Sequence, residues 1–216
     1  MNIVNNKVLY TELINNPRYK LLDELSHDEM KSFILAEMVR KPLYARIISW
    51  YQTAGVLTFL AGSFLAFLPV FTKRESVYLW WLLAGIVFSF TVLVLLHELI
   101  HAAAYRYVGA KNISFGMYLR KFMFYVQADR QVLNYKQFRI VALAPAVVVF
   151  VASVVGMTVF SLQPALYFFI PVFGLHSIFC GGDFGLLCYF QNRNDKNILT
   201  YDVKSETKTY FYEQIS

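Results

Sequence analysis

Charged residues are scarce in this sequence. Lysine, arginine, aspartate and glutamate together make up 16% of its 216 residues, whereas hydrophobic residues make up 57%. The mean hydropathy is +0.46, and the apolar residues are grouped into long blocks. The shortage of charge excludes an ordinary soluble domain and is typical of a membrane protein with several spans.

Cysteine is also rare, and repeats are missing. The two cysteines, Cys180 and Cys188, both lie inside the last apolar run, where a disulfide framework would have no role, so we expect reduced packing residues. We find no internal repeat, no low-complexity stretch and no glycine-rich phosphate loop. The net charge of +6 is not gathered into a basic stripe, so we expect no nucleic-acid partner and take the lipid bilayer as the partner of the basic residues.

Four apolar stretches are long enough to cross a bilayer as helices, since a hydrocarbon core of roughly 30 Å needs about 20 residues. They lie at 48–71, 77–104, 138–162 and 165–190. The sequence therefore predicts an all-α polytopic membrane protein with about four transmembrane helices. We divide it into an amino-terminal cytoplasmic or interfacial segment (1–47), a four-span core (48–190) and a cytoplasmic tail (191–216).

The distribution of basic residues predicts the orientation. Eighteen of the 20 lysines and arginines lie in 1–47, 105–139 and 191–216, and the short 72–76 turn carries only Lys73 and Arg74. Because basic residues are retained on the cytoplasmic side, we expect both termini in the cytoplasm.

Three shorter segments outside the spans have recognisable patterns. Ser26 and Glu29 fit a capping box that would begin a helix over 27–39, lying against the membrane or the domain. Residues 113–127 are rich in aromatic and β-preferring types interrupted by Arg120 and Lys121, which predicts a short interfacial hairpin. The tail at 198–213 alternates weakly and suggests another small hairpin.

The second span ends in the sequence His97-Glu98-Leu99-Ile100-His101. At helical pitch the two histidines lie on one face about 6 Å apart, so both rings can reach one Zn²⁺ ion. Glu98 projects toward the same side and is placed to deprotonate a zinc-bound water. This HExxH pattern predicts a zinc hydrolase with Glu98 as its catalytic base.

Asp183 is the expected third zinc ligand. Counting about 1.5 Å per residue from the basic residues that end the spans places His101 roughly 8 Å, His97 roughly 14 Å and Asp183 roughly 15 Å inside the boundary. An ionised carboxylate at that depth costs at least about 2.5–3.5 kcal/mol, which a metal ion would offset. Two histidines and one aspartate leave an open position for water, as in catalytic zinc sites. Neighbouring glycines, Gly181, Gly182 and Gly185, would allow close helix approach or local unwinding.

His176 lies seven residues before Asp183, so an unbroken helix would separate the two by about 10 Å along its axis and allow only one of them to be a ligand. We favour Asp183. His176 would then hydrogen-bond the substrate backbone, help to stabilise the oxyanion or hold a water.

These residues together resemble the intramembrane zinc metalloproteases of the site-2 protease class and, more closely, a family of small bacterial membrane proteins described as putative zincin peptidases. The resemblance covers roughly 75–190 and rests on the HExxH motif, on Ala142-Leu143-Ala144-Pro145 and on Gly181-Gly182-Asp183. The sequence departs from the site-2 class in that Phe184 follows Asp183, no proline directly precedes it, and His176 stands near the position of that class's asparagine.

The resemblance implies peptide hydrolysis at a bacterial cytoplasmic membrane, acting on a membrane protein or peptide substrate. It implies that His97, His101 and Asp183 hold zinc and that Glu98 is the general base and proton shuttle. Since a helical segment shields its carbonyl groups, the substrate must be extended, and the 113–127 hairpin would offer it an edge strand.

Other functions fit the same residues. The chain could bind zinc as a non-catalytic membrane adaptor, or its buried histidines and aspartate could serve ion transport or haem binding. A soluble-type zincin would instead recruit Glu206 or Glu213 as third ligand. Asp183 and His176 could also be polar helix-packing residues. The substrate and the oligomeric state do not follow from the sequence.

Overall fold

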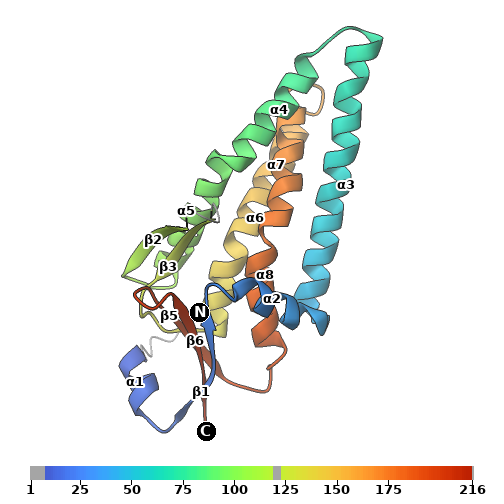
Figure 1. The fold of residues 1–216 in the computed structure, drawn as a ribbon. Coiled ribbons are helices and arrows are strands. Elements are labelled where there is room, and N and C mark those ends of the chain that lie inside the picture. Colours follow the sequence, from blue (N-terminus) through green and yellow to red (C-terminus); the bar gives the residue numbers. More distant parts are fainter. Residues whose placement is uncertain (1–7, 119–122, 216) are drawn as a thin grey trace.

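The apolar segments form long helices that run side by side in the computed structural model, which describes residues 8–118 and 123–215 (Figure 1). Among the described residues, three helices are long and apolar enough to cross a membrane, and a bent pair makes a fourth if it counts as one span. They are α3 (Leu43–Thr72), α6 (Tyr135–Val159), the run Leu166–Gln191 made of α7 (Leu166–Phe179) and α8 (Gly181–Gln191), and the bent pair α4 (Val77–Phe90) with α5 (Val92–Tyr107). All four predicted spans therefore fall on helices, and their insertion in a bilayer stays a prediction.

The second predicted span is bent, which the sequence pattern did not indicate. The axes of α4 and α5 differ by 46° across a break at Thr91. The Thr91 hydroxyl donates to the carbonyl of Val87 at 2.7 Å, and the Ser89 hydroxyl donates to that of Gly85 at 2.7 Å. Hydroxyls that bond back to the preceding turn often bend helices, and this bend sets the direction of the helix that carries the HExxH motif.

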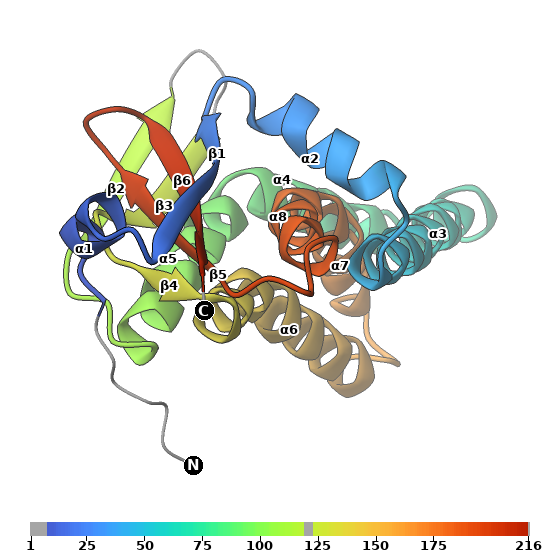
Figure 2. The same cartoon turned by 90° about the horizontal axis from the view of Figure 1, so that it is seen from below.

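Helix α7 lies in the centre of the bundle, between α3, α4 and α6 (Figure 2). Its neighbours approach closely at glycines. A Cβ atom at Gly85 of α4 would collide with the carbonyl oxygen of Phe168, and one at Gly55 of α3 would collide with the side chain of Ser177. These close approaches enclose α7 on all sides, which explains why its side chains are apolar around most of the helix.

A four-stranded antiparallel sheet lies at the end of the bundle that also holds α8, and the α3–α4 and α6–α7 turns lie at the opposite end (Figure 1). The predicted tail hairpin is confirmed as β5 and β6. The sequence pattern missed the two outer strands, because β1 alternates poorly and β4 is only two residues long. The strand order is β1 (Tyr19–Ser26), β6 (Lys208–Gln214), β5 (Ile198–Val203) and β4 (Leu133–Asn134).

The predicted hairpin is confirmed as β2 (Ile113–Tyr118) and β3 (Met123–Ala128), which pair in antiparallel register with Phe115 opposite Val126. Its position at a membrane interface stays a prediction. Arg120 and Lys121, expected at its turn, lie outside the described residues. The hairpin packs beside α5, with Ile113 and Val126 against a cluster that includes Tyr105 (Figure 1). It thus lies next to the helix that carries the motif.

The amino-terminal segment contains α1 (Tyr10–Asn15) and α2 (Met30–Val39). The predicted capping box is wrong, because Ser26 is the last residue of β1 and pairs with Lys208. Helix α2 consequently begins at Met30, with Glu29 as an N-cap that makes no side-chain hydrogen bond. By contrast, α6 begins with a capping box between Asn134 and Gln137, three residues before the predicted start of that span.

Helix α2 is attached to the end of α8 by a buried carboxylate. Glu37, which is 7% exposed, accepts from the guanidinium Nη1 of Arg193 at 3.0 Å and from the side-chain amide of Asn192 at 2.7 Å. The Arg193 guanidinium also lies 3.8 Å from the centre of the Tyr189 ring. Because Glu37 is shielded from water, these contacts are stronger than those of a surface ion pair.

Glu37→Ala should therefore lower the free energy of unfolding by about 1.5–3 kcal/mol, the contribution of hydrogen bonds to a charged group. Thermal unfolding of the purified protein in detergent would measure the loss. Glu29→Ala is the matched control, because Glu29 is exposed and precedes the same helix. If the two variants unfold at the same temperature, the attachment contributes nothing to stability.

Candidate metal centre

The two histidines of the motif lie one turn apart on α5 and face the interior of the bundle. Each is 8% exposed, and their Nε2 atoms are 3.1 Å apart. Two neutral imidazoles presenting Nε2 atoms to one another have two lone pairs directed at a shared point. That arrangement is typical of a metal site rather than of two packing residues.

Asp183, in the first turn of α8, faces the same point. Its Oδ1 atom lies 3.3 Å from Nε2 of His101, and its Oδ2 atom lies 3.4 Å from Nε2 of His97. The helical run Leu166–Gln191 is interrupted at Cys180, directly before Gly181 and Gly182. Asp183 is therefore carried by a short helix of its own that follows the interruption.

The spacing of these atoms fits a zinc ion. Tetrahedral zinc with bonds of about 2.0–2.2 Å separates its ligand atoms by roughly 3.3–3.6 Å, and the three separations given above, 3.1, 3.3 and 3.4 Å, are close to these values. The Oδ2 atom of Asp183 is buried and makes no hydrogen bond. A buried carboxylate oxygen without a partner is costly unless a cation completes its environment.

Helix α6 contacts the His101 ring at Nδ1, the nitrogen that does not face Asp183. This Nδ1 atom lies 3.0 Å from the carbonyl oxygen of Val141, which can only accept, so the proton is on Nδ1 and Nε2 is free for a metal. A histidine ligand commonly donates its second ring N–H to a carbonyl or carboxylate in this way. Val141 directly precedes the Ala142-Leu143-Ala144-Pro145 segment of the sequence.

Glu98 lies beside the three-residue group without being part of it. Its carboxylate interacts with the backbone of Val126 of β3 and with the side chains of His97, His101 and Asp183. The β2–β3 hairpin therefore reaches the motif directly, through the main chain of its second strand. The sequence pattern predicted the hairpin but could not indicate which of its residues would lie against α5.

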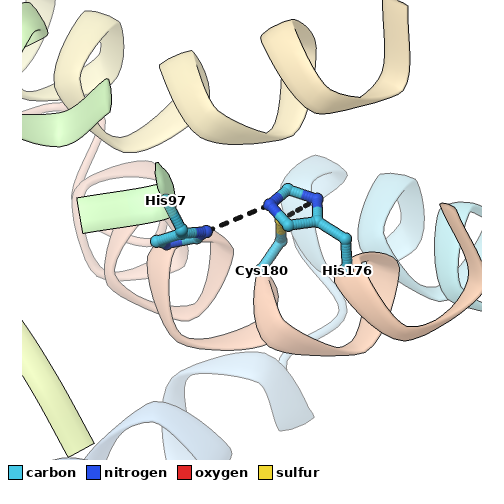
Figure 3. Close-up of side chains that lie close together, drawn as sticks. All are labelled: His97, His176 and Cys180. Atoms are coloured by element: carbon cyan, nitrogen blue, oxygen red, sulfur yellow. Dashed lines mark hydrogen bonds between the residues drawn. The ribbon is translucent and has the colours of Figure 1, made fainter. Parts of the chain in front are cut away.

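His176 does not lie among the groups that face the Asp183 carboxylate. It is fully buried on α7, with Nε2 3.1 Å from Nδ1 of His97 (Figure 3). His101 instead faces Nε2, the other nitrogen of that ring. Cys180, also fully buried, has its Sγ atom 3.5 Å from Nδ1 of His176. The sequence analysis treated Cys180 as a packing residue, although its spacing of four from His176 would have placed both on one helical face.

In the described part of the chain, two groups of three side chains bring ligand atoms within 4.8 Å of one another: His97 with His101 and Asp183, and His97 with His176 and Cys180. The tail carboxylates have other partners. Glu213 accepts from Lys196 at 2.9 Å, and Glu206 accepts from the hydroxyl of Tyr210. Of these two groups, the one formed by His97, His101 and Asp183 has the spacing expected of tetrahedral zinc ligands.

A comparison with protein families finds one that matches residues 90–197, and its description is "Putative zincin peptidase". The matched region begins at the end of α4 and continues past α8, so it contains the HExxH motif, Val126, Val141, His176 and Asp183. No curated protein and no solved structure matches the chain.

Proposed function

Because the chain belongs to the putative zincin peptidase family, a family name that indicates a zinc metallopeptidase, we propose that it is a membrane-embedded, zinc-dependent endopeptidase. Its substrates would be membrane proteins or membrane-proximal peptide segments. The observation that carries the proposal is the tetrahedral spacing of His97 Nε2, His101 Nε2 and the Asp183 carboxylate on helices apolar enough to cross a bilayer.

The three side chains would hold the zinc, and the bound ion would polarise the scissile carbonyl and lower the pKa of its water toward about 7. Glu98 has a separate role, since its carboxylate lies beside the group and next to the backbone of Val126 on β3. It would take the proton of the attacking water and pass it to the leaving amine. Val141 would keep His101 in the tautomer that presents Nε2.

The β2–β3 hairpin would bind the substrate. A peptide must be extended to be cut, and an extended peptide can pair with the main chain of an exposed strand. In support, Val126 of β3 contacts Glu98 through its backbone, and this strand packs beside α5. A segment paired with β3 would pass close to the zinc ligands.

We place the helices in a bilayer, with both termini and the sheet on the cytoplasmic side of a bacterial cytoplasmic membrane. The helix α3 supports this placement, because only 17% of its most apolar window is buried within the protein. Its outer face carries large apolar side chains, including Trp50, Leu57, Phe64 and Phe71, which are 61–80% exposed. Lipid would cover them.

Removal of the metal should abolish hydrolysis. We expect the purified protein, reconstituted in liposomes, to cleave a membrane peptide, to lose that activity on dialysis against a chelator and to regain it with Zn²⁺. Elemental analysis should find one zinc ion per chain. A protein that binds no zinc would contradict the proposal, and a protein that binds zinc but cleaves no membrane peptide would instead support a non-catalytic zinc-binding adaptor.

A further inference from the structure

The second buried group, formed by His97, His176 and Cys180, has no role in the proposed hydrolysis (Figure 3). His176 and Cys180 are both 0% exposed, so neither can touch a substrate. Buried polar side chains are ordinarily partnered and usually serve the group that they contact. The contact here is with His97, which is common to both groups.

The proton positions in this group follow from one another. When zinc binds Nε2 of a neutral histidine, the single ring proton is on Nδ1. The Nδ1–H of His97 then donates to Nε2 of His176 across 3.1 Å. His176 accepts at Nε2, so its own proton is on Nδ1, which lies 3.5 Å from Cys180 Sγ. The sulfur accepts this last hydrogen bond.

We propose that His176 is a positioning residue of the metal centre, which holds the His97 ring by accepting its Nδ1–H, while Cys180 holds His176 in the accepting tautomer. This inference rests on the proposed zinc site. The centre then has one acceptor behind each histidine ligand, the Val141 carbonyl for His101 and the His176 ring for His97.

The depth of the site explains why such an acceptor is needed. His97 lies on α5 with its ring enclosed between His101 and His176. An N–H buried there without an acceptor would be destabilising, because it loses its hydrogen bonds to water and gains none in return. His176 supplies the acceptor from α7, which packs against α4 and α6.

A second metal ion in this group is less consistent with the geometry. His97 would have to bind both ions through its two nitrogens and would lose its only proton. Two divalent ions would also repel strongly in a medium of low dielectric. In addition, Sγ of Cys180 lies 3.9 Å from Nε2 of His176, wider than the roughly 3.5–3.6 Å expected between a sulfur and a nitrogen ligand of tetrahedral zinc with bonds of about 2.3 and 2.0–2.1 Å.

The test is the zinc affinity of the full-length protein in detergent, measured by competition with a chelator. His176→Leu removes the acceptor and should weaken zinc binding by about 10–100-fold, as outer-shell substitutions do. His176→Gln keeps an acceptor oxygen and should restore most of that affinity. Cys180→Ala should cause a smaller loss, and Cys188→Ala, which removes an equally buried thiol outside the group, should leave the affinity unchanged.

Equal zinc affinity of wild type and His176→Leu would overturn the inference and leave the proposed zinc site intact, whereas a wild type that binds no zinc would overturn both. If His176→Leu fails to fold, the zinc affinity of Cys180→Ala is compared with that of Cys188→Ala, and equal affinities would overturn the inference. The cobalt-loaded protein provides a second readout. We expect no thiolate-to-cobalt absorption band, and a band that disappears in Cys180→Ala would make Cys180 a metal ligand and contradict the positioning role.

Discussion

Glu98→Gln should lower the rate of peptide hydrolysis by about 10²–10⁴-fold, the usual contribution of a general acid–base group, and should leave the zinc content unchanged. The amide is almost the same size as the carboxylate but cannot take a proton from water. Glu98 is also not among the three side chains whose ligand atoms converge. Turnover of a membrane peptide in liposomes, together with elemental analysis of the same sample, would measure both quantities.

The matched control for this prediction is Glu75→Gln. Glu75 is exposed in the turn between α3 and α4, at the opposite end of the bundle from the sheet (Figure 1). The Glu75→Gln variant should hydrolyse the membrane peptide as fast as wild type. If Glu98→Gln did so as well, the chain would not be a hydrolase that uses this motif, and the adaptor function would be favoured.

Asp183→Asn should weaken zinc binding by more than the roughly 100-fold that outer-shell substitutions reach. The substitution keeps the volume of the side chain but removes the charge that lies 3.3–3.4 Å from both histidine Nε2 atoms. Hydrolysis should disappear with the metal. Chelator competition measures the affinity, and Asp195→Asn, at an exposed position beyond α8, is the control.

Thermal unfolding distinguishes between two roles of Asp183, that of a metal ligand and that of a packing residue. Zinc at 100 times its dissociation constant should stabilise wild type by about 2.7 kcal/mol and should not stabilise Asp183→Asn. In the absence of zinc the variant should be at least as stable as wild type, because it no longer buries an uncompensated carboxylate. A variant that is destabilised without zinc but still stabilised by it would make Asp183 a packing residue.

The helices could be predicted because hydrocarbon leaves the backbone few alternatives. A segment that crosses a bilayer must satisfy its own N–H and C=O groups, so the apolar runs at 48–71 and 138–162 indicate helices from composition alone. The bend at Thr91 was not predictable, because a hydroxyl bonds back to its own helix only when the packing allows it. The strand β1 was missed because its residues alternate poorly, and because its partner β6 lies about 190 residues later in the chain.

The candidate site was predictable in part. Histidines four apart on a helix share a face whatever the fold, and depth along two spans placed Asp183 near their level. The contacts of His176 were not predictable. Its Nε2 lies against Nδ1 of His97 because α7 is enclosed between α3, α4 and α6 (Figure 2). A local sequence pattern does not indicate which side chains of other helices a central helix will contact.

The sequence by itself determined that the chain has several long apolar helices, that His97 and His101 share one helical face and that the chain resembles its family, because composition and helical spacing are local properties that any fold must respect. Only the tertiary structure decided that the Asp183 carboxylate lies within 3.4 Å of both Nε2 atoms. The structure also decided that Val141 and His176 lie behind the two histidine rings and that β3 reaches Glu98. These contacts join α5 to elements that follow it by tens of residues, and their distances depend on the packing of the whole bundle.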